Sequence, residues 1–456
     1  MPFDHDFLES ELAVLPPARK FWVGFSGGAD STALLHAMLA LRERLDTPVR
    51  AIHVNHGLHA DANAWEEHCR DWCERHGAAL QVLRVSVSRS SGRGIEAEAR
   101  RQRYRAIAER LQGGDQFLTA HHREDQAETL LLNLMRASGV DGLAGMPRTR
   151  TLGAGLLVRP LLEVDRDALR AYLEEHRLDF LEDPSNRDPV HDRNFMRLTV
   201  LPILEQRWPS AASRIARSAR YCGQAATALE RLAERTLEPL LKHERLLELP
   251  TGDNADTLDL ALLLRHWLRR NGLDTPPAAR LDEFCRQLAQ AQPGNHIALA
   301  WHDGLVREHD GHLWLDSARS ATPPPGVTWS GDRPLALGAA SGIMTFSAPP
   351  RLSQPELQVT FRCGGERIRI SDRTPRKSVK SVLREAGLPP WQREIVPLVF
   401  AGDRLLAVAD LCLDNAFRRE LENQSVQLSW TPGDALLAYT RQRALERAVD
   451  PPGTLG

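Results

Sequence analysis

The chain has 456 residues, which is enough for two or three domains and at least one complete hydrophobic core. Its formal net charge of −2 excludes a globally basic nucleic-acid-binding protein, so any contact with RNA must come from local basic patches. Six cysteines are too few for a disulfide scaffold, and no Cys-x-x-Cys pair or zinc-ligand spacing occurs. With no secretory leader and no apolar run long enough to span a bilayer, we expect a cytoplasmic protein without membrane contact.

The first predicted elements are a short buried strand over 21–25 and a helix over 30–39. Between them lies the segment Ser-Gly-Gly-Ala-Asp-Ser at 26–31. Two adjacent glycines allow a sharp turn that aims successive N–H groups at one point, and the helix N-terminus adds partial positive charge. These features predict a phosphate-binding loop, which is not a Walker A loop because no Gly-Lys-Ser/Thr follows. The alternative is an ordinary glycine turn, which the flanking serines and aspartate disfavour.

Strands and helices alternate from residue 20 to about residue 146. Further strands are predicted over 48–56, 80–87 and 116–121, and helices over 61–75, 95–111 and 124–136. This alternation predicts an α/β fold with a doubly wound parallel sheet. Ligands of such sheets bind beyond the carboxyl ends of the strands, where the loop at 26–31, His53 and the pair His121-His122 converge.

Acidic residues open the helix predicted over 124–136. Asp125 and Glu128 are three residues apart and share a face, so they could hold Mg²⁺ or the ammonium of an amine substrate. The alternative is that acidic residues merely complement the helix dipole. In the helix that begins near residue 95, Arg103 could face a phosphate, or it could belong to a solvated face of Glu/Arg pairs.

The rest of the chain is predicted to be mostly helical to residue 292, with a β-hairpin over 296–315 that turns at 309–311. We divide the chain into a catalytic domain (1–215), a helical domain that binds substrate or tRNA (216–316), a connector with some strand content (317–356) and a small α+β domain that binds tRNA (357–445).

Two basic patches could contact RNA. Arg214 and Arg217 lie on one side of a predicted helix, and Arg376, Lys377 and Lys380 precede Trp391. We expect these cations to contact the tRNA backbone, with an exposed Trp391 as a stacking surface. The alternative is a solvated basic face in each case.

The segment at 26–31 resembles the pyrophosphate-loop signature of the ATP pyrophosphatases. Taken with six further motifs, the chain resembles the tRNA(Ile)-lysidine synthetase family over most of its length. The motifs are Ser26–Ser31, His53–Leu58, Gly94–Tyr104, His122–Thr129, Glu182–Asn186, Arg193–Arg197 and Arg376–Trp391. One departure is Glu124-Asp125, where the family usually has two aspartates, so no defined role is transferred to Glu124.

The resemblance implies an adenine nucleotide α hydrolase-like fold and a two-step ligation that needs ATP and Mg²⁺. ATP adenylates the C2 oxygen of the cytidine at the first anticodon position (CAU) of tRNA(Ile), and pyrophosphate leaves. The ε-amino group of L-lysine then attacks C2 and expels AMP, which forms lysidine. Because lysidine pairs with A rather than G, both codon reading and aminoacylation change from methionine to isoleucine.

The resemblance also implies roles for individual residues. ATP-binding residues are expected to be Ser26, Gly27, Gly28, Ala29, Asp30, Ser31 and His53, with Asp30 and Asp125 as metal ligands. Catalytic residues are expected to be Asp30, His122, Asp125 and Arg103, with His122 moving a proton. Lysine is expected to bind Asp125, Glu128 and Arg103. Contacts with tRNA are expected from Arg193, Asn194, Arg197, Arg214, Arg217, Arg376, Lys377, Lys380 and Trp391.

Two other functions compete with this one. A tRNA thiolase uses the same loop but needs a reactive cysteine pair or an iron–sulfur cluster, which the lack of Cys-x-x-Cys disfavours. A non-catalytic tRNA-binding protein would have no need of the intact loop or of His122, Asp125 and Glu128. The oligomeric state stays open, a homodimer included.

Overall fold

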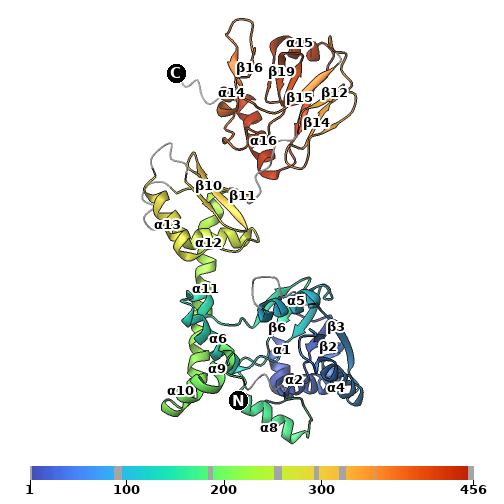
Figure 1. Ribbon diagram of the computed structural model, residues 1–456, viewed down its shortest axis with the longest axis vertical. Helices are drawn as coiled ribbons and strands as arrows, with labels where there is room; N and C mark the ends of the chain where they lie inside the picture. The colour runs from blue at the N-terminus through green and yellow to red at the C-terminus, as the bar shows by residue number, and fades with distance from the viewer. Residues whose placement is uncertain are drawn as a thin grey trace. The chain divides into compact units, whose positions relative to one another are not determined.

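The computed structural model describes residues 3–86, 95–182, 188–250, 259–291, 297–317, 325–354 and 356–449. The chain divides into two compact units, residues 1–229 and 230–456 (Figure 1). Gly94 and residues 183–186, which belong to two of the motifs above, lie outside the described residues.

A six-stranded sheet forms the centre of the first unit, in the order β3-β2-β1-β4-β6-β5. Five strands run parallel: β1 (Lys20–Gly24), β2 (Val49–Asn55), β3 (Ala79–Arg84), β4 (Asp115–Leu118) and β6 (Gly155–Val158). The sixth, β5 (Thr149–Leu152), pairs antiparallel with β6. The predicted parallel sheet is confirmed. The β5–β6 hairpin was not predicted, because its four-residue strands are too short to show a clear period.

Helices cover both faces of this sheet. Phe21, Val23 and Phe25 of the first strand segment pack with α1 (His5–Ala13), α2 (Ala29–Ala40), α4 (Ala62–Arg75) and α8 (Arg166–Glu175). Trp22 points the other way and packs with Ile107 of α5 (Ile95–Ala108). Successive side chains of a strand alternate between faces, so β1 supplies both cores, as expected for a doubly wound sheet (Figure 1).

The remaining helices of the first unit follow the sheet. The short α3 (Arg42–Leu45) follows α2, and α6 (Arg123–Met135) leads to α7 (Val140–Leu143). Next come α9 (Asp192–Phe195), a π-helical turn over Met196–Val200 and α10 (Leu201–Arg207). The long α11 (Ala211–Leu237) continues into the second unit. Ala127, Leu201 and Ala212 form a small core that joins α6, α10 and α11.

The first part of the second unit combines a sheet with helices α12 (Leu260–Arg270) and α13 (Ala278–Ala289). The strands are β7 (Leu241–His243), β8 (Leu246–Glu248), β9 (Ala298–Ala300), β10 (Gly304–His309) and β11 (His312–Ser317), in the order β7-β8-β11-β10-β9. The predicted β10–β11 hairpin is confirmed, with Asp310 and Gly311 at positive φ. The helical prediction across β7 and β8 was wrong, because three-residue strands draw their stability from the neighbouring β11 rather than from local pattern.

The segment predicted as a connector carries β12 (Val327–Trp329), β13 (Leu335–Ala336) and β14 (Ile343–Phe346). It is not separate from the C-terminal domain, because β12 pairs with β15 (Leu357–Thr360) and β14 pairs with β21 (Leu428–Thr431). The other elements there are β16 (Arg367–Ile368), β17 (Lys377–Ser378), α14 (Val379–Glu385), β18 (Leu398–Ala401), β19 (Arg404–Val408), β20 (Cys412–Leu413), α15 (Asn415–Glu422) and α16 (Ala435–Val449).

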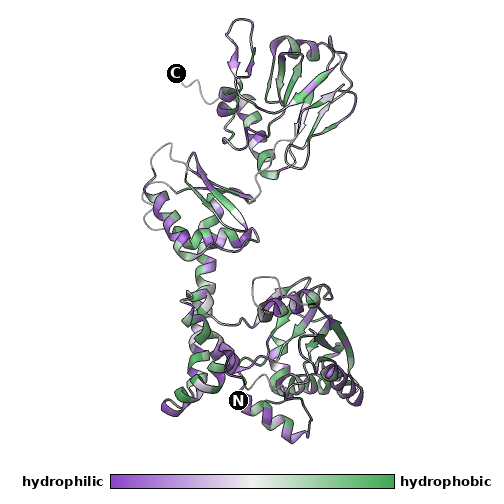
Figure 2. Ribbon diagram, viewed as in Figure 1, coloured by the Kyte–Doolittle hydropathy of each residue, from purple (hydrophilic) through white to green (hydrophobic). Residues whose placement is uncertain are grey.

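Apolar residues gather on the strands, whereas polar residues are interleaved along the helices (Figure 2). Among the described residues no helix has the length and apolar character needed to cross a membrane.

Candidate active site

The loop at 26–31 joins β1 to α2 as predicted, and its side chains hold its own backbone. The Ser31 hydroxyl donates to the Gly28 carbonyl at 2.9 Å and lies 3.0 Å from Ser26 Oγ. No side chain caps α2, so the first N–H groups of the helix, beginning at Ala29, keep their donors for an anion.

Gly27 is required at its position because its φ is +80°. A Cβ atom there would also lie 3.0 Å from Leu181 Cδ1 and 3.2 Å from Cys69 Sγ. Leu181 reaches this point because its N–H donates to the Gly27 carbonyl at 2.8 Å. The turn is therefore held from outside as well as from within, which pre-organises its donors for a phosphate.

His122, at the N-terminus of α6, is 1 % exposed and faces three carboxylates. Its Nδ1 lies 2.9 Å from Glu124 Oε2, while its Nε2 lies 3.6 Å from Asp30 and 3.5 Å from Asp125. Burial disfavours the charged ring, but these carboxylates outweigh burial and raise the pKa of His122 to about 10. His122 is thus an imidazolium at neutral pH. A base that takes a proton from lysine must itself be unprotonated, so His122 cannot act as that base in this state.

We expect the His122 ring to stay protonated from about pH 6 to pH 8. Because its pKa is raised from 6.5 to about 10, its contribution to stability is complete below pH 6.5 and is lost as the pH rises through 10. Histidine ring NMR signals, assigned with His122→Gln, measure this titration. A midpoint near that of an exposed histidine would contradict the expectation.

Asp125 and Glu128 share a face of α6, as predicted, but both already hold arginines. Arg193 Nε donates to Glu128 at 2.8 Å and its Nη2 donates to Asp125 at 2.9 Å. Arg197 makes the equivalent pair of bonds at 2.6 and 2.9 Å. The guanidinium groups of Arg193 and Arg197 are thus turned into the site and paired with carboxylates, and their expected contact with tRNA stays a prediction.

The arginine pair could have been recognised from its spacing. Arg193 and Arg197 are four residues apart, which places them on one helical face. Asp125 and Glu128, three residues apart, share a helical face for the same reason. Glu128 is completely buried, and a buried carboxylate requires a cation partner. Burial opposes ionisation of Asp125, yet the neighbouring His122 and Arg193 lower its pKa.

His53 and Arg103 differ in burial and in the partners that their side chains contact. The His53 ring is buried and its Nδ1 donates to the Phe25 carbonyl at 2.9 Å, so His53 supports the loop from β2. Exposed Arg103 donates from Nε to His56 Nε2 at 3.1 Å, a contact that was not predicted. Burial and Arg103 lower the pKa of His56 to about 4, so this histidine is neutral.

Mg²⁺ binds through one or two carboxylates together with substrate phosphates. Asp30 suits this role because it stands in the first turn of α2 and its side chain is 35 % exposed. Asp125 suits the role of metal ligand less well, because its Oδ1 accepts from two arginines and its Oδ2 accepts from the backbone N–H of His122. The carboxylate of Asp125 is occupied in this arrangement of side chains, and its role as a metal ligand stays a prediction.

Comparison with known proteins supports the resemblance. Family models match residues 5–204 (PP-loop domain), 260–314 (TilS substrate binding domain) and 357–430 (TilS substrate C-terminal domain). A tRNA(Ile)-lysidine synthase of Xanthomonas campestris pv. campestris (strain 8004) is 42 % identical over 420 residues, which cover 92 % of this chain and 96 % of that one. The chain belongs to the tRNA(Ile)-lysidine synthase family.

A second relative, the tRNA(Ile)-lysidine synthase of Methylococcus capsulatus (strain ATCC 33009 / NCIMB 11132 / Bath), is 37 % identical over 440 residues, or 93 % of this chain and 99 % of that one. A solved U34-tRNA thiolase from Methanococcus maripaludis matches 48 % of this chain and 76 % of that one at 16 % identity, with a TM-score of 0.40, which is too low to bear on function. As a lysidine synthase family member, the chain is an ATP-using ligase that modifies tRNA.

The side chains of the two patches predicted to contact tRNA are exposed, except that of Lys377. Arg214 and Arg217 are exposed on α11. Arg376 and Lys380 are exposed near the β16–β17 hairpin, whereas Lys377 is half-buried and paired with Glu385.

The Trp391 and Asn194 side chains have partners within the chain. The expected exposure of Trp391 is corrected, because its ring is half-buried near Trp314 with the Arg307 guanidinium 4.7 Å from its centre. Asn194 Nδ2 donates to the Asp188 carbonyl at 2.8 Å.

Proposed function

We propose that this enzyme joins L-lysine to C2 of the cytidine at the first anticodon position of a tRNA(Ile) with a CAU anticodon. The observation that carries the proposal is the pre-organised loop at 26–31 beside His122 and its carboxylates, in a chain of the lysidine synthase family. The first step adenylates a poor leaving group, and the second replaces it with an amine.

In the first step, the cytidine C2 oxygen attacks the α-phosphorus of ATP, the bond to the β-phosphate breaks, and pyrophosphate leaves. The N–H groups at the start of α2 and the Ser26 hydroxyl favour the charge that develops on pyrophosphate, while Ser31, whose hydroxyl donates to the Gly28 carbonyl, holds the loop in shape. The His122 imidazolium adds a cation beside Asp30. Mg²⁺, held by Asp30 and the phosphates, would supply further neutralisation of this charge.

In the second step, the lysine ε-nitrogen attacks C2, the C2–O bond breaks, and AMP leaves with the oxygen. The ε-ammonium must first lose a proton, and the resting His122 already carries one. We propose that lysine binds at Asp125 and Glu128 after displacing the Arg193 or Arg197 guanidinium. Because this exchange replaces one cation with another, the charge around His122 is unchanged, so the lysine ammonium loses its proton to solvent, and His122 moves a proton only after releasing its own.

For tRNA we propose backbone contacts by Arg214 and Arg217 and by Arg376 and Lys380, with Lys377 and Asn194 in supporting positions. Arg103 would contact a phosphate or the lysine carboxylate. The chain would act in the cytoplasm, either alone or as a homodimer, with domain limits near residues 215 and 316.

The double variant R376Q/K380Q is expected to weaken tRNA binding and to reduce the slope of log K against log salt by about one to two, because two phosphate contacts are lost. Filter binding at several salt concentrations measures this slope. The control R333Q/R351Q removes two exposed charges from the same unit and should leave the slope unchanged. Equal slopes for the two variants would show that Arg376 and Lys380 form a solvated basic face that does not contact tRNA.

The activity is tested by incubating the full chain with ATP, radiolabelled lysine and unmodified tRNA(Ile) carrying a CAU anticodon. We expect label in the RNA that requires ATP, and none with a tRNA whose first anticodon base is not cytidine. Label that appears without ATP, or no label at all, would contradict the proposal.

Sulfur transfer by Cys69 and Cys73 is disfavoured by their environment. Cys69 and Cys73, the pair that shares a face of α4, are 0 % and 1 % exposed and lie in the hydrophobic core. Burial raises the pKa of both thiols to about 12, so neither is a thiolate at neutral pH.

A further inference from the structure

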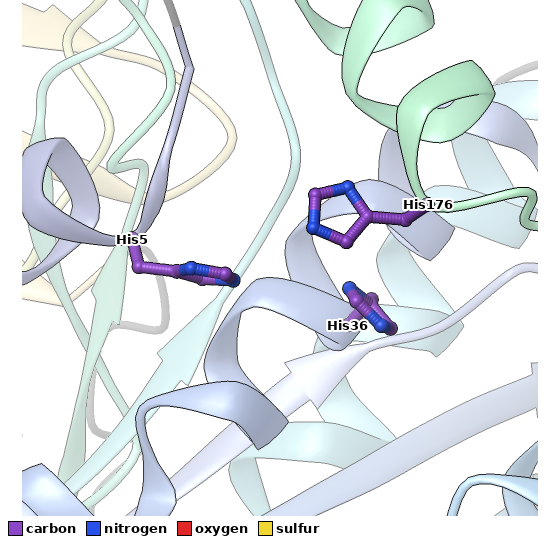
Figure 3. A group of neighbouring side chains, drawn as sticks. All are labelled: His5, His36 and His176. Carbon is purple, nitrogen blue, oxygen red and sulfur yellow. The ribbon is translucent and has the colours of Figure 1, made fainter.

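Three histidines from separate helices meet on the α2 side of the first unit, away from the residues assigned to ATP and lysine. His5 begins α1, His36 lies near the end of α2, and His176 caps the C-terminus of α8 (Figure 3). Each is half-buried, and one ring nitrogen of each lies within 4.8 Å of the corresponding nitrogen of the other two. None of the three belongs to the motifs that carry the resemblance.

One ring nitrogen of each histidine makes a hydrogen bond that orients the ring. His176 Nδ1 lies 2.9 Å from the Tyr172 carbonyl, which can only accept, so this nitrogen carries the proton and Nε2 keeps its lone pair. His36 Nδ1 lies 2.8 Å from the Tyr172 hydroxyl, which can donate or accept, so this contact orients the ring without fixing its tautomer. Histidine ligands of metal ions characteristically donate their other N–H in this way.

Tyr172 forms the floor of the cluster. Its ring is 3 % exposed and stacks on His176 with centroids 4.1 Å apart, while its hydroxyl also lies 2.9 Å from His5 Nε2. Ordinary packing would not require three imidazoles to face one another, since each loses hydration without gaining a charged partner. Burial and the neighbouring histidines lower the pKa of His36 to about 4, so its ring is neutral and able to coordinate at neutral pH.

We propose that His5, His36 and His176 bind one divalent transition-metal ion of the zinc class, with water in a remaining position. Imidazole nitrogens are preferred ligands of Zn²⁺, Ni²⁺ and Cu²⁺, and Zn–N bonds of about 2.0–2.1 Å place neighbouring nitrogens about 3.3 Å apart. Small rotations of these half-buried rings would therefore bring nitrogens that lie within 4.8 Å of one another to that separation. The ion would fasten α1 and α8 onto α2, and so stabilise the helices behind the ATP-binding loop.

A second group, Asp274, His302 and Asp303, also satisfies the distance limit among the described residues. Its Asp274 and His302 are exposed, and solvent satisfies them without a metal. The test below therefore uses a variant of this second group, H302Q, as its control.

The test uses the full chain without a polyhistidine tag, stripped of metal with a chelator. Zn²⁺ is titrated against a chromophoric chelator, and Co²⁺ is added separately to read the ligand field by absorption. We expect one high-affinity site per chain, at least tenfold weaker binding in H36Q/H176Q, and unchanged binding in the control H302Q. Zinc should also raise the melting temperature of the wild type and H302Q, but not of H36Q/H176Q.

His5→Gln, in the first turn of α1, provides a second variant in case the double variant fails to fold, which circular dichroism reports. It should weaken Zn²⁺ binding while retaining the helical spectrum. Loss of the site in H302Q, unchanged affinity in both cluster variants, or no stoichiometric Zn²⁺ binding by the wild type would overturn the proposal.

Discussion

Asp30→Ala is expected to lower tRNA-dependent ATP–pyrophosphate exchange by about 10²–10³-fold, the range for removal of one pre-organised electrostatic group. The carboxylate lies at the start of α2 and 3.6 Å from His122 Nε2, so its loss removes the proposed Mg²⁺ ligand and one neighbour of the His122 ring together. Since the side chain is partly exposed, folding should be preserved.

Asp167→Ala is the matched control for this variant. Asp167 occupies the same second position of α8 that Asp30 occupies in α2, so both variants lose the same interaction with a helix dipole. Exchange at the wild-type rate in Asp30→Ala, or an equal loss in Asp167→Ala, would show that the loop carboxylate has no special part in the first step.

Glu128→Ala is expected to destabilise α6 by about 3–5 kcal/mol, because it leaves two inward-facing guanidinium groups with Asp125 as their remaining carboxylate. Native-state hydrogen exchange of the α6 amides measures this change without assuming that the two units unfold together. Lysine incorporation should fall in parallel, since the same carboxylate is proposed to hold the ammonium.

A double-mutant cycle with Arg197→Met separates this ion pair from the cavity left by the glutamate side chain. If the charges are coupled, the combined loss in E128A/R197M should be smaller than the sum of the single losses by about 1–3 kcal/mol. Glu283→Ala, which removes an exposed partner of Arg286 on α13, should leave amide protection there unchanged. Additive losses in the cycle would mean that packing, not charge, accounts for the effect.

The site was predictable where its chemistry is local in the chain. The loop at 26–31 could be recognised because the glycines, the serines and the helix start are adjacent, and short-range steric and dipole effects determine such a turn. The i, i+3 spacing of Asp125 and Glu128 placed them on one face for the same reason. Elements of only two to four residues, such as β5 and β7, carry too few side chains for their period to be read.

Composition, periodicity and the loop motif by themselves determined that the chain is an α/β nucleotide-binding protein and which strand ends would meet. Only the tertiary structure decided what each charged group does. Arg193 and Arg197 neutralise carboxylates that precede them by 65 to 72 residues, and His122 becomes a cation because carboxylates from two helices surround it. Such pKa values and pairings depend on burial and on distances between segments, which no local pattern encodes.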